Sequence, residues 1–176
     1  MTTTISRPLE RQPRQPTRRQ ARFAFIVLLV INILNYTDRY VLSAVLPKVV
    51  KDLSLSSLQA GLLGSSFLLV YGISTLPLGI WADRNVRKNI VTFCVTIWSV
   101  ATVLAGFARN FLMLFSVRAV LGIGEAGYAP ASLSLLGDYF PINLRGRVLS
   151  FWSGGQLIGA AIGFTMGGII AGSALG

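Results

Sequence analysis

Long stretches without a charged residue constrain the fold of this chain more than any other feature. Residues 58–81, 89–108 and 148–176 contain no Asp, Glu, Lys or Arg. As helices rising about 1.5 Å per residue, all three can cross a hydrocarbon layer of about 30 Å. Hydrophobic residues make up 53% of the chain and charged residues 12%, against about 25% charged in soluble domains. This composition disfavours a cytosolic enzyme, a disordered chain and, with Cys94 as the single cysteine, a disulfide scaffold.

Two further apolar segments raise the expected number of membrane-spanning helices to five. Strand-like alternation is absent, and a helix satisfies its own backbone hydrogen bonds in lipid, so we expect an all-helical integral membrane bundle. Ser56 and Gln59 form a Ser-x-x-Gln capping box, and Asn110 is a candidate N-cap. Residues 23–176 form the expected transmembrane domain, with spans over about 23–47, 57–81, 89–108, 110–137 and 147–174.

Residues 1–22 differ from the rest, because prolines and arginines replace large apolar side chains. We expect this segment to be a disordered basic tail. Basic residues also gather in the connections at 82–88 and 138–147, and the positive-inside rule then places the N-terminus in the cytoplasm. We interpret the tail as a segment that orients the spans. Nucleic-acid binding is disfavoured, since the tail has no interleaved aromatic residues and no recognisable binding module.

Four ionisable residues lie inside the expected spans. Asp38 and Arg39 are in the first span, and Arg118 and Glu125 are in the fourth. Each costs at least about 2.5 kcal/mol on insertion scales, so we expect a function for them, with a purely structural ion-pair staple as the alternative. Their depths allow Asp38 to pair with Arg118 and Arg39 to reach towards Glu125. Protonation of either acid would then release an arginine, which is the chemistry of a proton-coupled transporter.

A loop and a glycine pattern are further candidate functional features. In the stretch 79–88, an acid at a helix end is followed by several bases, which indicates either a gate that latches onto a neighbouring helix or a solvated loop needed only for topology. Gly155, Gly159, Gly163 and Gly167 recur every four residues, with Gly168 and Gly172 in a second row. This spacing favours close helix packing, and the functional alternative is a sliding surface.

These residues resemble a known family. Gly79…Ala82-Asp83-Arg84…Arg87-Lys88 resembles the loop signature between helices two and three of the major facilitator superfamily, and Arg118-x-x-x-Gly122-x-Gly124 resembles its helix-four signature. The segments 34–39, 122–126 and 140–147 resemble the anion:cation symporter and Spinster-like branches, and 124–130 leans towards the Spinster-like branch. Two positions depart from the family pattern: Val86 replaces a usual glycine, and Phe164 replaces the proline of a helix-five signature.

The resemblance implies a transporter that works by alternating access, with two six-helix halves around a central cavity. This chain would supply helices one to five of twelve, and we expect it to be an N-terminal part whose C-terminal half is missing. The resemblance also assigns roles to residues. The substrate-binding candidates are Arg39, Arg118, Asn35, Tyr36, Tyr128 and Gln156; the proton-coupling candidates are Asp38 and Glu125; and the cytoplasmic gate comprises Gly79, Asp83, Arg84, Arg87 and Lys88.

The first functional hypothesis is a secondary transporter of a small organic anion, coupled to protons, in the lipid bilayer of a bacterial inner (plasma) membrane. Two buried arginines favour an anion, since guanidinium binds carboxylate or phosphate bidentately. Export or flipping of an amphipathic lipid-like molecule is the alternative that the Spinster-like resemblance implies, and a non-transporting membrane protein with a structural ion-pair cluster is a third. An intramembrane enzyme is disfavoured, because the chain has no histidine and no phosphate loop. We expect no catalytic residues, no cofactor and no metal.

Overall fold

The computed structural model describes residues 16–173, and the elements of this part of the chain are five helices. They are α1 (Arg18–Asp52), α2 (Ser57–Arg84), α3 (Arg87–Ala105), α4 (Phe111–Tyr139) and α5 (Ile142–Ser173). All five are long and apolar enough to cross a membrane. The predicted all-helical architecture with five spans is therefore confirmed.

The first helix begins earlier than its apolar segment predicts. Residues 1–15 of the expected tail lie outside the described residues, but the chain is helical from Arg18 onwards, so the tail boundary at residue 22 is wrong. The cause is a second capping box. The Gln20 amide donates to Thr17 Oγ1 at 3.3 Å, and the Thr17 amide donates to Gln20 Oε1 at 2.9 Å. These bonds start the helix ahead of its apolar part.

Two of the other helix starts agree with the sequence predictions, whereas one end of α1 and one end of α5 do not. The capping box of Ser56 with Gln59 and the N-cap of Asn110, which accepts from the Met113 amide at 2.9 Å, are confirmed. By contrast, α1 continues to Asp52 and α5 begins at Ile142, so both helices extend beyond the apolar segments. Charged residues end an apolar segment but not a helix, because most of them are good helix formers in water.

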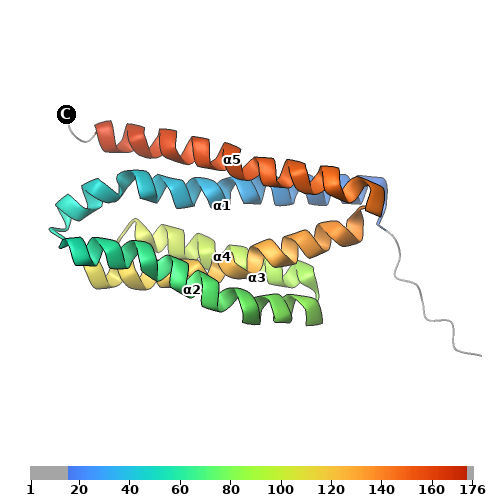
Figure 1. Cartoon of the computed structure of the whole chain (residues 1–176), viewed down its shortest axis with the longest axis horizontal. Helices are drawn as coiled ribbons and strands as arrows, with labels where there is room; N and C mark the ends of the chain where they lie inside the picture. The colour runs from blue at the N-terminus through green and yellow to red at the C-terminus, as the bar shows by residue number, and fades with distance from the viewer. Residues whose placement is uncertain (1–15, 174–176) are drawn as a thin grey trace, which may run out of the picture.

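The helices form two groups that run side by side (Figure 1). One group is the pair α1 and α5, and in the other α4 packs against both α2 and α3. The start of α1 and the α2–α3 and α4–α5 connections lie at one end of the bundle, and the α1–α2 and α3–α4 connections lie at the other. The basic connections at 82–88 and 138–147 are therefore at the same end as the start of α1.

Glycines set the distance between α5 and α1, as the four-residue spacing predicts. Gly155, Gly159, Gly163 and Gly167 are the buried residues of α5 together with Trp152. A Cβ atom at Gly163 would lie 2.6 Å from the Thr37 carbonyl oxygen and 2.8 Å from Tyr40 Cβ. Only glycine allows this approach. In the second row, a Cβ atom at Gly168 or Gly172 would meet no atom within 4 Å, so this row faces away from the described helices.

Glycines of α4 play the same part on the other side of the bundle. A Cβ at Gly124 would lie 2.8 Å from the Trp98 amide nitrogen of α3, and one at Gly122 would lie 3.0 Å from the Phe67 carbonyl oxygen of α2. The two glycines of the Arg118-x-x-x-Gly122-x-Gly124 signature thus let α4 lie against both neighbours. This packing fixes the depth and direction of Arg118 and Glu125 on α4.

Candidate functional site

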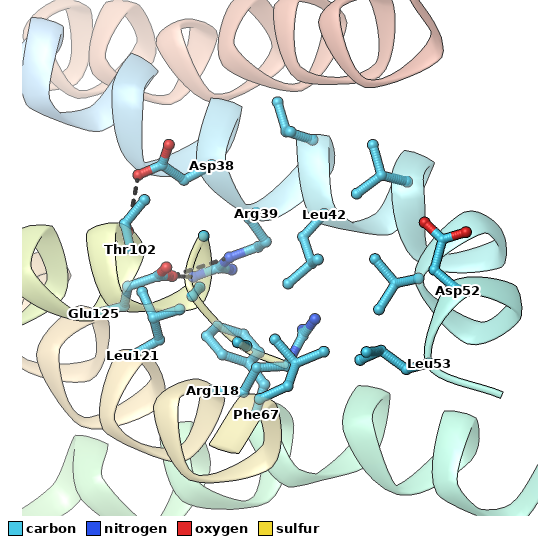
Figure 2. Close-up of a pocket in the computed structure, with 17 residues that line it drawn as sticks. Asp38, Arg39, Leu42, Asp52, Leu53, Phe67, Thr102, Arg118, Leu121 and Glu125 are labelled. Carbon is cyan, nitrogen blue, oxygen red and sulfur yellow. Dashed lines mark hydrogen bonds and ion pairs between the residues drawn. The ribbon is translucent and has the colours of Figure 1, made fainter. Parts of the chain in front are cut away.

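A cavity of about 420 Å³ lies between α1, α3 and α4 and holds all four ionisable residues of the spans (Figure 2). Asp38 and Arg39 line it from α1, and Arg118 and Glu125 line it from α4. It extends from these residues to the end of α1 at Asp52. The rest of the wall is mainly apolar, with Val41, Leu42, Val45, Val49, Leu53, Phe67, Leu114 and Leu121.

Arg39 and Glu125 form an ion pair between α1 and α4, as their positions predict. The Arg39 Nε atom donates to Glu125 Oε2 at 3.1 Å, and a terminal guanidinium nitrogen of Arg39 contacts the same oxygen. The Glu125 side chain is 3% exposed and that of Arg39 is 25% exposed. Asn35 adjoins the same carboxylate one turn earlier on α1, and its Nδ2 atom is buried there without a hydrogen bond of good geometry. Glu125 is therefore enclosed by side chains of α1.

Aromatic rings surround the guanidinium of Arg39. Its Cζ atom lies 5.0 Å from the ring centres of Tyr36 and Phe67 and 5.3 Å from that of Tyr71. These distances are in the range of cation–π attraction. Phe67 and Tyr71 were not among the residues expected from the sequence, although their four-residue spacing on α2 places both rings on one face. The rings and Glu125 together hold Arg39 in one position.

Asp38 faces a different helix from its neighbour Arg39. Its carboxylate accepts from Trp98 Nε1 of α3 at 2.8 Å. It also accepts from the hydroxyl of Thr102, on the same helix, at 3.4 Å (Figure 2). The expected pair of Asp38 with Arg118 is wrong. Consecutive residues of a helix point about 100° apart, so Asp38 turns to α3 while Arg39 turns to α4.

Arg118 has no ion-pair partner among residues 16–173. Its Nε atom is buried without a hydrogen bond, and its Cζ atom lies 5.8 Å from the Phe67 ring centre. The side chain reaches the cavity wall. A buried N–H donor without an acceptor is costly, and carboxylate or phosphate oxygens fit the fork of N–H groups of a guanidinium. The cavity therefore presents one cation that is paired and one that is not.

The remaining substrate-binding candidates lie apart from the cavity wall. Tyr128 is 1% exposed in the core, where its hydroxyl donates to the Leu28 carbonyl oxygen at 2.6 Å. Gln156 is half-buried on α5 and does not line the cavity. Tyr36 contacts Arg39 without lining the cavity. In this conformation, Arg39 and Arg118 therefore line the cavity. Asn35 and Tyr36 do not line it, but they lie close to the Arg39–Glu125 pair.

Comparison with known proteins identifies the family. The profile of the Major Facilitator Superfamily matches residues 28–176. The chain belongs to the major facilitator superfamily. Its helix-four signature accordingly carries one of the cavity residues, Arg118, and Glu125 directly follows the last glycine of that signature, Gly124.

Relatives in this superfamily include Spinster proteins and a probable L-galactonate transporter. The chain is 33% identical over 144 residues to protein spinster homolog 1 of Xenopus laevis, covering 81% of this chain and 27% of the relative. It is 34% identical over 139 residues to a probable L-galactonate transporter of Escherichia coli, covering 79% and 31%. A crystal structure of a bacterial homologue of the human lysosomal transporter Spinster, inward-facing and occupied, superposes with a TM-score of 0.84 at 35% identity, covering 89% and 34%. The chain thus spans about a third or less of these proteins.

The predicted gate residues of this superfamily signature lie at the basic end of the bundle. Arg87, at the start of α3, forms an ion pair with Asp138 in the last turn of α4. Asp83, Arg84 and Lys88 are exposed, and a Cβ at Gly79 would meet no atom within 4 Å. Asp138 was not expected from the sequence. Of the five gate candidates, the structure gives Arg87 an ionic partner on another helix.

Proposed function

We propose that this chain is part of a secondary transporter that carries an organic anion together with protons by alternating access. The observation that carries the proposal is Arg118, whose half-buried side chain has no ionic partner among residues 16–173 and lines the cavity between α1 and α4. In this proposal Arg118 binds the carboxylate or phosphate of the substrate. The relatives' length beyond this chain supplies the opposite wall of the cavity.

Protons would bind two acidic residues of the cavity, Asp38 and Glu125. Protonation of Glu125 removes the negative partner of Arg39 and frees a second guanidinium for the anion. Asp38 is the second proton-coupling candidate, and its carboxylate accepts hydrogen bonds from Trp98 and Thr102 of α3. Binding of the anion and binding of the proton are coupled in this way, because each one changes the net charge of the cavity in which the other binds.

The orientation follows from the charge distribution. The basic end of the bundle, with Arg84, Arg87 and Lys88, would face the cytoplasm of a bacterial cell, and the N-terminus would lie on the same side. The pair of Arg87 with Asp138 would then form part of the cytoplasmic gate. Its opening would loosen the α2–α3 connection from the end of α4.

An amphipathic, lipid-like anion is the second candidate substrate. The observation in its favour is the apolar wall of the cavity, where Leu42, Val45 and Leu121 lie beside the arginines. A single acyl chain would cover this wall while its anionic group binds Arg118. Similarity to a sphingosine-1-phosphate transporter of Danio rerio favours the same class of substrate.

Uptake into proteoliposomes under an imposed pH gradient tests the proposal. The probes are L-galactonate, as a water-soluble carboxylate, and a single-chain phospholipid, as an amphipathic anion. We expect gradient-driven uptake that is lost in Asp38→Asn and Glu125→Gln. Asp52→Asn is the matched control, because Asp52 lines the same cavity at its far end.

The two probes separate the candidates. Gradient-driven uptake of the carboxylate supports the first, and movement of the phospholipid that ignores the gradient supports the second and refutes proton coupling. If neither probe moves and Arg118→Ala changes no ligand response, the ion-pair cluster is structural.

A further inference from the structure

A second hollow, of about 670 Å³, lies at the basic end of the bundle, away from the four ionisable residues of the spans. It is bounded by the first turns of α1 and α5 and the last turn of α4. Its charged residues are Arg18 and Arg22 from α1, Arg145 from α5 and Asp138 from α4. The transport proposal uses Asp138 in the gate and gives the three arginines no role.

The arginines of this hollow lack acidic partners. None of the ion pairs among residues 16–173 involves Arg18, Arg22 or Arg145, whereas Asp138 is already paired with Arg87. Arg18 and Arg22 are one turn apart on α1, where like charges repel. Three cations gathered around one hollow, with the acid that lines it neutralised, favour binding of an anion.

The geometry of the hollow adds donors to this charge. Arg145 Nε donates to the Phe140 carbonyl oxygen at 3.0 Å, which fixes the guanidinium beside the hollow and leaves its terminal nitrogens available. The N-terminal ends of two long helices, α1 and α5, also meet here. Two helix N-termini place partial positive charge at the hollow, against the partial negative charge of the one C-terminus there, that of α4. Phosphate groups are among the anions that helix N-termini bind.

The depth of the hollow matches the headgroup layer of a membrane. Arg22 is the last charged residue of α1 before its apolar segment, and Ile26, one turn further, is 57% exposed. On α5, Leu144 beside Arg145 is 40% exposed, and Phe151, two turns further, is 63% exposed. An anionic group in the hollow would therefore have apolar surface directly below it for acyl chains.

We propose that this hollow is a binding site for a phosphate group, supplied by an anionic phospholipid of the surrounding leaflet. Arg22 of α1 and Arg145 of α5 contact the phosphate oxygens, and these two helices pack against each other. Arg18 adds positive charge at the rim of the hollow. The site is independent of the transport proposal, because it uses none of the cavity residues.

Lipid binding to the detergent-purified protein tests this proposal. Fluorescent phosphatidylglycerol is the probe, phosphatidylcholine is the lipid without net charge, and inorganic phosphate is the soluble competitor. We expect phosphatidylglycerol to bind in preference to phosphatidylcholine. Arg22→Gln and Arg145→Gln should each weaken its binding about fivefold, the equivalent of about 1 kcal/mol per basic residue.

Matched controls separate the hollow from general positive charge. Arg147 is exposed like Arg145, lies two residues after it on α5 and does not line the hollow. Arg109 is exposed in the α3–α4 connection, at the opposite end of the bundle (Figure 1). Arg147→Gln and Arg109→Gln should leave binding nearly unchanged. Competition by millimolar phosphate assigns the site to a soluble phosphate and overturns the lipid as its source, and lack of competition assigns it to the lipid headgroup. Equal binding of both lipids, or an equal loss in Arg147→Gln, overturns the proposal.

Discussion

A single methyl group added at Gly163 is expected to push α5 away from α1. The new Cβ would lie 2.6 Å from the Thr37 carbonyl oxygen, 2.8 Å from Tyr40 Cβ and 3.1 Å from the Val41 amide nitrogen. Two of these neighbours are backbone atoms, which have no rotamer with which to yield. Overpacking of this kind costs about 1–3 kcal/mol, and the helices have to separate to relieve it.

The control for this change is Gly168→Ala on the same helix. A Cβ at Gly168 meets no atom within 4 Å among the described residues. Both substitutions gain about 1 kcal/mol of helix propensity, so this contribution cancels in the comparison. Gly163→Ala should therefore be less stable than Gly168→Ala by about 1–3 kcal/mol.

Cys94 provides the assay. It is the single cysteine of the chain and is buried in a cluster that joins α1, α3, α4 and α5, so a fluorogenic thiol dye reacts with it when this core opens. Thermal unfolding of the purified protein would be followed by this reaction. Equal unfolding temperatures for Gly163→Ala and Gly168→Ala would refute the packing of α5 on α1 through its glycine face.

Three further predictions concern hydrogen bonds and ion pairs. Tyr128→Phe should lose about 1 kcal/mol of stability, with the substrate response unchanged, because its hydroxyl binds a backbone carbonyl of α1; a weakened substrate response would return Tyr128 to the site. Arg87→Gln and Asp138→Asn should each cost about 1 kcal/mol or less, and the double variant no more than either, since the pair is partly exposed; additive losses would show that they do not interact. Trp98→Phe should destabilise the protein by about 1.5–3 kcal/mol, and much less in an Asp38→Ala background, which has no side-chain acceptor; equal losses in both backgrounds would rule out the bond to Asp38.

The elements of this fold could be predicted from the sequence because each follows from local patterns. Uncharged stretches fix the spans, and Ser56 and Asn110 fix two helix starts. The boundaries failed where polar sequence continues a helix. Thr17 and Gln20 carry the same capping pattern as Ser56 and Gln59, and that signal could have found the start of α1.

The partners of the buried charges were predictable in part. Depth along the helices brought Arg39 to the level of Glu125, and the structure confirms this pair. Depth does not determine which neighbouring helix a side chain meets. Asp38 faces Trp98 because α3 lies on that side of α1, and this arrangement depends on the close packing at the glycines of α4 and α5. Phe67 and Tyr71 could not be assigned to the site from the sequence, because depth does not show that α2 lies beside Arg39.

We expect Arg118 to be the cation that binds an organic anion, and a thermal-shift screen tests this role most directly. Carboxylates and organic phosphates would be added to the purified protein and to Arg118→Gln, with Arg109→Gln as a control, because Arg109 is an exposed arginine outside the cavity. We expect at least one anion that stabilises the original protein and Arg109→Gln but not Arg118→Gln. An anion that stabilises Arg118→Gln equally well would contradict this claim.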